Sequence, residues 1–340
     1  MKTLSTLMLG ATGGTAAWLI NIPLPWMLGP LILIMVLAIC GVQTRINRLG
    51  NRFFLGVLGF WLGSRFEPAV FQQVVDWYPS VLIMTLSVIL IILVNTLLFR
   101  WLAKLDLITS IFASLPGNLN AVIIMGEQLG GDGRWIAIAQ TLRITLVIIS
   151  TTVIFFLMPE YDLSGPAIDS QQSQSLLYLP LVPLAWWASR WIRLPMPEFL
   201  GPLLASAILA SLGFNTDLPG WVMVITFIVL GSYIGGRFYG TRIKQLLQVS
   251  FYAVLATLLA MLIAAGFALM TYWLLDIPFS HAFLALVPGG IGEMALIAAS
   301  ADIDPLYIVF MHIIRMFLLM FATPAIGRYL STRVPRQSER

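Results

Sequence analysis

Long apolar runs with almost no charge constrain the fold of this chain more than any other feature of its sequence. Clear examples span 81–99, 144–158 and 251–273. Each approaches the roughly 20 residues that an α-helix needs to cross a bilayer. Charged residues make up only 10% of the 340 residues, against about 25% in a soluble domain. Because the runs are too long and too continuous for barrel strands, we expect an all-α polytopic membrane protein.

A duplication within the chain is the second strong feature. Residues 22–30 (IPLPWMLGP) match residues 194–202 (LPMPEFLGP), 172 residues later. At the same spacing and without a gap, matched glycines, prolines, aspartates and a tryptophan lead to the pair Arg143 and Arg315. Chance can match leucines at this composition, but not these rarer residues at one spacing. We therefore expect two structural repeats.

Each repeat is expected to contain six helical segments. The segments are expected at about 4–21, 26–43, 50–66, 78–103, 106–130 and 133–158, and again at about 176–192, 198–214, 221–238, 249–275, 278–301 and 305–330. The expected domains are membrane repeat 1 at 1–158, an external polar linker at 159–175, membrane repeat 2 at 176–331 and a cytoplasmic basic tail at 332–340.

The fifth segment of each repeat is interrupted in its middle by a Pro-Gly pair, at 116–117 and at 288–289. Proline removes a backbone hydrogen bond and clashes with the preceding turn, while glycine permits a reversal of the chain. Two interpretations follow from this pattern. Either the helix kinks and crosses the bilayer, or it turns back as a re-entrant hairpin.

The placement of lysine and arginine decides between the two interpretations. Lys2 and the loops at 45–52 and 100–104 carry the positive charge and are assigned to the cytoplasm. The linker 159–175 has no Lys or Arg, and it reaches the outside only if the fifth segment turns back. Five crossings per repeat then invert the second repeat relative to the first. We expect about ten transmembrane helices plus two re-entrant hairpins in a bacterial inner membrane, with both termini cytoplasmic.

Arg143 and Arg315 are the leading candidates for a binding site. Each lies 11 residues beyond an aspartate, Asp132 or Asp304, that suits the N-cap of the sixth segment. Eleven residues of helix rise about 16 Å, which is near the middle of a hydrocarbon core of about 30 Å. A buried arginine at that depth is costly, so it suggests a functional site.

The hairpin tips are expected to join this site. The second arm of each hairpin is a half-helix whose amino terminus offers free N–H groups and a positive dipole end. Together with the arginines this favours an anionic substrate, a carboxylate above other anions. The predicted substrate-binding residues are Arg143, Arg315, Asn118, Asn120, Gly117, Gly289, Gly290, Gln140 and His312.

Glu293 is the predicted coupling-ion residue, for a proton or a sodium ion, because it lies four residues beyond Gly289. Two alternatives stay open. His312 could carry the coupling proton instead, or Glu293 could form a buried ion pair with Arg315 that locks the hairpin to the sixth segment. Ala121 stands where Glu293 would be in the first repeat, so Arg143 is the better ligand candidate.

Two further residue types have plain structural interpretations. Gly59 and Gly63, and likewise Gly231 and Gly235, are spaced four apart, which is typical of closely packed membrane helices. Cys40 lies inside an apolar run and is expected to be a small core residue.

The doubled Pro-Gly hairpin, the aspartate that opens the next helix, the arginine 11 residues later and the Leu-Gly-Pro near the start of each repeat resemble the AbrB family of bacterial integral membrane proteins. The resemblance covers nearly the whole chain. It implies a regulator of gene expression, an ammonia monooxygenase-like protein or a transporter, which are the labels that members of that family carry. Asn118 departs from the Pro-Gly-Gly that is usual in the family.

A secondary transporter of a small organic anion, driven by protons or sodium, is the function that we expect. No nucleophile–base pair points to an enzyme, and no G-x-x-x-x-G-K-[ST] loop points to ATP. Two histidines and one cysteine cannot make a convincing copper or di-iron site, so no metal or cofactor is expected. The alternative is a membrane-embedded regulator of gene expression that acts through an effector or a partner protein. The expected partners are the anion, the coupling ion and the lipid bilayer but not nucleic acid, and a homodimer is left open.

Overall fold

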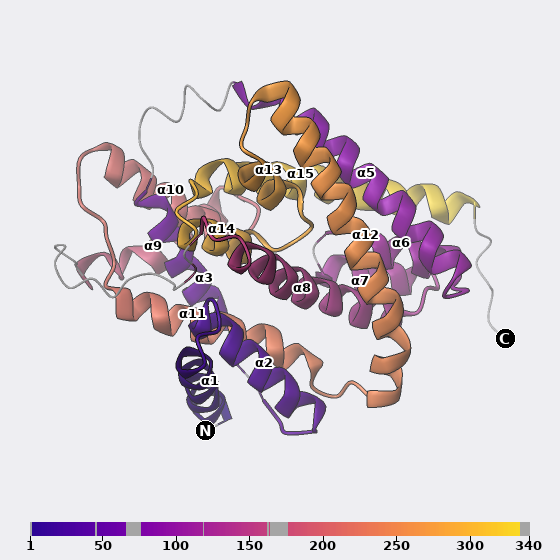
Figure 1. Cartoon of the computed structure of the whole chain (residues 1–340), viewed down its shortest axis with the longest axis horizontal. Coiled ribbons are helices and arrows are strands. Elements are labelled where there is room, and N and C mark those ends of the chain that lie inside the picture. Colours follow the sequence, from indigo (N-terminus) through magenta and orange to yellow (C-terminus); the bar gives the residue numbers. More distant parts are fainter. Residues whose placement is uncertain are drawn as a thin grey trace. The chain divides into compact units, whose positions relative to one another are not determined.

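The described part of the chain is helical throughout. The computed structural model describes residues 2–44, 46–65, 76–117, 119–161, 163 and 176–333, and these residues contain no strand. The first half holds α1 (Lys2–Leu19), α2 (Pro25–Ile39), α3 (Arg48–Gly63), α5 (Tyr78–Trp101), α6 (Leu107–Ser114), α7 (Leu119–Gln128) and α8 (Gly133–Phe156). The second half holds η1 (Leu176–Tyr178), α9 (Leu181–Trp191), α10 (Pro197–Ser211), α11 (Gly220–Gly235), η2 (Gly236–Phe238), α12 (Ile243–Leu275), α13 (Phe279–Leu286), α14 (Ile291–Ser300) and α15 (Pro305–Arg333) (Figure 1).

The helix ends repeat at the spacing found in the sequence. Both ends of α2, α3, α6 and α7 recur 172 residues later as the ends of α10, α11, α13 and α14. The backbone repeats as well, because Leu24 (φ 48°) and Met196 (φ 44°) both take the left-handed conformation directly before α2 and α10. Large side chains rarely adopt that conformation. The two halves therefore share a helix pattern, while their inverted orientation stays a prediction.

Five of the described helices are long and apolar enough to cross a membrane. They are α5, α8, α11 extended by η2, α12 and α15. The helices α2 and α10 are apolar but have only 15 residues each, which is about 22 Å against a hydrocarbon core of about 30 Å. The all-α membrane class is thus supported by five helices, and the count of about ten spanning helices stays a prediction.

The structure corrects two expectations, one about where a helix begins and one about the burial of Cys40. The fourth segment of the second repeat begins at Ile243 and not near 249, because its first turns are polar and a search for apolar runs passes over them. Cys40 is exposed and is not a core residue. Since α2 ends at Ile39, the cysteine forms the C-cap of that helix and leaves its packed face.

The chain divides into two compact units that do not coincide with the two repeats. Unit 1 consists of Met1–Asp76, Thr151–Gly240 and Ala295–Leu306, and unit 2 consists of Trp77–Ser150, Thr241–Met294 and Tyr307–Arg340. Each unit therefore takes segments from both halves of the sequence. The first three α-helices of each repeat gather in unit 1, and α6, α7 and α13 belong to unit 2, while α14 is divided between the two units after Met294.

Unit 1 is held together by glycines that bring helices of opposite halves into contact. Helix α3 packs on α10, and α2 packs on α11. A Cβ atom added to Gly59 or Gly63 would collide with a backbone carbonyl of α10, and one added to Gly231 or Gly235 would collide with a backbone carbonyl of α2. The close packing predicted from these glycines is confirmed.

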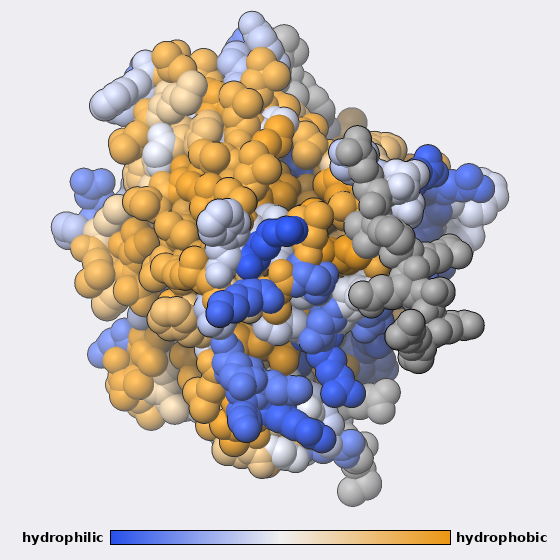
Figure 2. Space-filling view, turned by 90° about the vertical axis from the view of Figure 1, so that its right-hand side faces the viewer, coloured by the Kyte–Doolittle hydropathy of each residue, from blue (hydrophilic) through white to orange (hydrophobic). Residues whose placement is uncertain are grey.

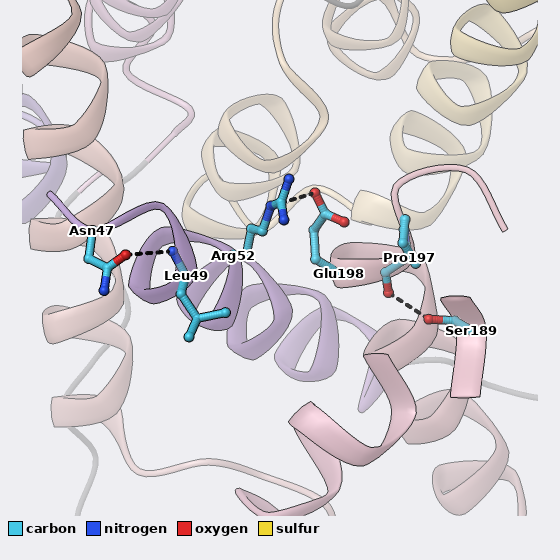
Figure 3. Close-up of polar contacts among 6 residues, drawn as sticks. All are labelled: Asn47, Leu49, Arg52, Ser189, Pro197 and Glu198. Carbon is cyan, nitrogen blue, oxygen red and sulfur yellow. Dashed lines mark hydrogen bonds and ion pairs between the residues drawn. The ribbon is translucent and has the colours of Figure 1, made fainter. Parts of the chain in front are cut away.

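Polar contacts reinforce the same packing in unit 1. The Nε atom of Arg52 on α3 lies 3.9 Å from Oε1 of Glu198 on α10. The Oγ atom of Ser189 on α9 donates to the carbonyl oxygen of Pro197, at 2.8 Å (Figure 3). Because Pro197 is the first residue of α10, this bond fixes the start of α10 against α9.

Unit 2 presents an apolar surface along α5 and α12. Helices α5 and α12 pack on each other, and each exposes a row of large side chains, among them Leu82 and Leu97 on α5 and Leu258 and Leu262 on α12. Large continuous apolar surfaces are unusual in soluble monomers. Figure 2 shows one face of the molecule, much of it hydrophobic. This surface fits a protein whose helices contact lipid.

Candidate functional site

The first Pro-Gly break reverses the chain. Gly126 of α7 packs against Phe112 of α6, although in a continuous helix 14 residues would separate them by about 21 Å. The backbone N–H of Asp132 donates to Oγ1 of Thr109, at 2.8 Å. The end of α7 therefore returns to the start of α6, as the hairpin interpretation predicts. The depth of this hairpin in a bilayer stays a prediction.

Both aspartates predicted to cap the sixth segment do so. Oδ1 of Asp132 accepts from the backbone N–H groups of Arg134 and Trp135, each at 3.0 Å. Oδ1 of Asp304 accepts from the N–H of Leu306 at 2.9 Å. These caps set the start of α8 and α15 and hence the positions of the arginines farther along each helix.

Arg315 closes the end of the helix before the second break. Its Nη1 donates to the carbonyl oxygen of Val287 at 2.7 Å, and its Nη2 donates to the carbonyl oxygen of Gly289 at 2.8 Å. Helix α13 ends at Leu286, so carbonyls here have no partner within a helix. A cation is also favoured at the negative end of a helix dipole. The side chain is only 4% exposed, and it satisfies a buried helix terminus.

His312 holds Arg315 in place and is neutral in this arrangement. Its Nε2 lies 2.9 Å from the carbonyl oxygen of Leu284, and its Nδ1 lies 2.6 Å from Nη2 of Arg315. A carbonyl oxygen only accepts, so Nε2 carries the proton. A guanidinium only donates, so Nδ1 accepts. A second proton on the ring would break the bond to Arg315 and place two positive charges together.

The first repeat uses Gln140 where the second uses His312. Nε2 of Gln140 donates to the carbonyl oxygens of Phe112, Ala113 and Leu115 at 2.9, 3.2 and 2.7 Å. Nη1 of Arg143 also donates to Leu115, at 3.3 Å. The bonds from Arg143 to Leu115 and from Arg315 to Val287 each span 28 residues. The placement of these residues one turn before the arginines is the one predicted from the sequence.

Arg143 is far less satisfied than Arg315. It is 8% exposed, yet its Nε atom has no hydrogen-bond partner within the described part of the chain, and the same is true of Oε1 of Gln140. Among the described residues, no carboxylate forms an ion pair with Arg143. Buried polar atoms are normally paired. This end of the site therefore offers an unused donor and an unused acceptor beside excess positive charge.

Glu293 and the glycines lie at the hairpin tips. Glu293 is in the first turn of α14, where an acid stabilises the positive end of the helix. A Cβ atom added to Gly290 would collide with the carboxylate of Glu293, and one added to Gly289 would approach the Met294 side chain to 2.8 Å. At Gly117 the nearest atoms to such a Cβ are 3.2 Å away or more.

The two asparagines predicted for the site are not described. Asn118 lies outside the described residues, and so does the side chain of Asn120, whose backbone belongs to α7. Their part in binding stays a prediction. All the other predicted site residues fall within unit 2.

Sequence reasoning missed two polar residues in unit 2. Thr109 receives the N–H of Asp132 and so closes the first hairpin. Asn95 in α5 is buried, and its Oδ1 has no partner among the described residues. The signal for Asn95 was present in the sequence, because a lone amide in a long apolar run is costly in a membrane. Nothing in the sequence marks Thr109, whose partner is a backbone group.

Comparison with known proteins gives consistent matches over most of the chain. A family profile described as "Transition state regulatory protein AbrB" matches residues 26–331. A protein of Escherichia coli (strain K12) named "Putative regulator AbrB" is 27% identical over 331 residues, which cover 94% of this chain and 93% of that protein. A protein of Bacillus subtilis (strain 168) named "Uncharacterized protein YhjN" is 26% identical over 362 residues, which cover 97% of this chain and 93% of that protein.

Proposed function

We propose that this chain, which belongs to the AbrB family of membrane proteins, is a secondary transporter of a small organic anion. It works by alternating access. A carboxylate is the proposed substrate group. The transporter is placed in a bacterial inner membrane, with about ten spanning helices in two inverted repeats, two re-entrant hairpins and both termini in the cytoplasm.

The state of Arg143 carries the proposal. Its guanidinium is buried, makes one long hydrogen bond and leaves Nε without a partner among the described residues. A carboxylate accepts two parallel N–H bonds from a guanidinium and brings the negative charge that the site lacks. The unused Oε1 of Gln140 would accept a bond from a hydroxyl or amino group on the same substrate.

Glu293 is proposed as the coupling-ion residue. It stands at the second hairpin tip, close to Gly290, where a carboxylate can exchange a proton or contribute to a sodium site. The first tip has Ala121 in the equivalent position. We therefore assign binding of the substrate to Arg143, near the first hairpin tip, and binding of the coupling ion to Glu293, at the second.

A second function is favoured by the name of one relative. The Escherichia coli protein is named a regulator, so the chain could regulate gene expression through an effector that it binds or removes, or through a partner protein. Neither this function nor transport requires catalysis. The two functions differ in whether the anion crosses the membrane, which uptake into proteoliposomes measures.

Substitution of Arg143 by glutamine is expected to weaken anion binding by roughly ten-fold or more, because charge-assisted hydrogen bonds contribute about 1.5–3 kcal/mol. The measurement is a thermal-shift and calorimetric titration of the purified chain against small hydroxy-, keto- and amino-carboxylates. Arg134→Gln is the matched control, since Arg134 is an exposed arginine in the first turn of the same helix. Equal binding by Arg143→Gln and wild type would place the pocket elsewhere. If no carboxylate binds to wild type, the proposed substrate class is wrong.

Labelling from the two sides of the membrane tests the proposed topology. Single cysteines at Ser170 and Ser338, positions outside the described residues, are expected to react from opposite sides. The background needs Cys40→Ala, because the native cysteine is exposed. If both positions react from the same side, the inverted arrangement is wrong.

A further inference from the structure

Unit 1 contains a cavity of about 550 Å³. Its wall is formed by the start of α1, by Thr44, Ile46 and Asn47 between α2 and α3, by the start of α3, and by the end of α11 with η2. The polar lining residues are Thr3, Thr44, Asn47, Arg48, Ser232 and Arg237. The volume falls in the range of about 300–1,000 Å³ that is typical of small-molecule sites. None of the candidate site residues in unit 2 is among the residues that line this cavity.

Two buried hydroxyl groups form the inner part of the cavity. Thr44 is 6% exposed and Ser232 is fully buried. Neither Oγ1 of Thr44 nor Oγ of Ser232 has a hydrogen-bond partner within the described part of the chain. Buried hydroxyls are almost always paired, since an unpaired one loses its bonds to water without compensation. Two such groups lining one cavity are free, among the described residues, to bind the polar atoms of a ligand.

The equivalent threonine in the second repeat has a hydrogen-bond partner for its hydroxyl group. Thr216 stands 172 residues after Thr44, and its Oγ1 lies 3.2 Å from Oγ of Ser206. Ile34 occupies the position equivalent to Ser206, so Thr44 has no such partner. The unpaired hydroxyl is therefore a property of this cavity and not of the repeated fold.

Positive charge gathers at the outer part of the cavity. Arg48 is exposed and Arg237 is partly exposed. The guanidinium of Arg237 lies over the ring of Tyr233, 5.0 Å from its centroid, which holds the arginine in position. Oδ1 of Asn47 accepts from the N–H of Leu49 at 3.0 Å (Figure 3), so α3 starts at the cavity with its positive end. The described lining residues include no Asp or Glu.

We propose that this cavity binds a phosphate group. The lining offers two guanidinium groups and two hydroxyl groups from residues 44–48 and 232–237, which suits the several oxygen atoms of a tetrahedral phosphate better than the two of a carboxylate. The phosphate belongs either to a soluble phosphorylated metabolite or to the headgroup of an anionic lipid. Both chemistries bring a compact anion to the arginines and acceptor oxygens to Thr44 and Ser232.

Two parallel experiments on the full chain separate the sources. In neutral detergent, the unfolding midpoint is measured against inorganic phosphate and glycerol 3-phosphate, with chloride at equal ionic strength as the reference. In nanodiscs, native mass spectrometry counts the phosphatidylglycerol and phosphatidylcholine molecules that stay bound. Each experiment uses wild type, Arg237→Gln and the double variant Thr44→Val/Ser232→Ala. The matched control is Arg65→Gln, because Arg65 occupies the equivalent position, stacks over Trp61 and does not line the cavity.

Arg237→Gln is expected to bind the phosphate roughly ten-fold more weakly or worse, as the loss of one charge-assisted contact implies, while Arg65→Gln keeps wild-type binding. Stabilisation by soluble phosphates alone assigns the cavity to a metabolite. Retention of phosphatidylglycerol alone assigns it to a lipid. The result that overturns the proposal is an equal response of wild type and Arg237→Gln in both experiments. Since Arg237 is partly exposed, this variant is expected to fold even if the buried double variant does not.

Discussion

Replacement of Arg315 by alanine is expected to cost several kcal/mol of stability, one of the two largest effects that we predict. The substitution leaves the carbonyl oxygen of Gly289 and Nδ1 of His312 without the partner that Arg315 supplies, and it removes one of the two hydrogen bonds to the carbonyl oxygen of Val287. Each buried polar group left without a partner costs about 1–3 kcal/mol. The measurement is thermal unfolding of the purified chain in detergent, followed by its tryptophan fluorescence.

Arg143→Ala is the matched control for this prediction. Arg143 has the same place in the first repeat but donates one bond of 3.3 Å, to Leu115. We therefore expect a small loss of stability from Arg143→Ala, together with the loss of anion binding. A variant Arg315→Ala as stable as wild type would contradict the assigned capping role. The double variant Glu293→Gln/Arg315→Gln tests the ion-pair alternative, because only a buried pair would let the second substitution restore stability lost by the first.

Gly59→Ala is expected to have the second large effect, a destabilisation of about 1–3 kcal/mol or more from overpacking. The new Cβ would collide with the backbone carbonyl of Phe199, and a backbone cannot turn aside as a side chain can. Helices α3 and α10 would have to separate. The measurement is the midpoint of unfolding in increasing sodium dodecyl sulfate, compared with wild type.

Gly50→Ala provides the control on the same helix. A Cβ at Gly50 would meet open space, and alanine favours a helix over glycine by about 1 kcal/mol. Gly50→Ala is therefore expected to be neutral or slightly stabilising. Equal effects of the two substitutions would mean that the approach of α3 to α10 does not matter for stability.

The helices and their breaks could be predicted because their causes are local. Asp132 and Asp304 cap helices that begin directly after them, and a proline followed directly by glycine, as at Pro116, favours a break in a helix. The two compact units could not be predicted in the same way. Neither Gly59 nor Gly231 indicates which helix it approaches, since that depends on contacts between residues more than 100 positions apart, as between Gly59 and Phe199.

The sequence predicts which residues form the candidate site but not which bonds they make. Depth and spacing single out Arg143, Arg315, Gln140 and His312, and all four lie in unit 2, while their role in binding stays a prediction. Their partners are mostly carbonyl oxygens next to the hairpin breaks, which every residue carries and no sequence distinguishes. The phosphate cavity was not foreseen for a related reason. The hydroxyl group of Thr44 has no hydrogen-bond partner among the described residues. A sequence does not show whether a hydroxyl group is paired in the folded protein.

Helices from the first half of the chain pack on helices from the second half, and this packing has a consequence for biogenesis. In unit 1, α2 and α3 from the first half pack on α11 and α10 from the second, and in unit 2 α5 packs on α12. A nascent chain that has inserted only its first half therefore has no complete core and must keep its glycine faces covered by lipid. Assembly must wait until the ribosome has delivered the second half. Two separately expressed halves, divided within 159–175, should then be degraded when made singly and should accumulate when made together.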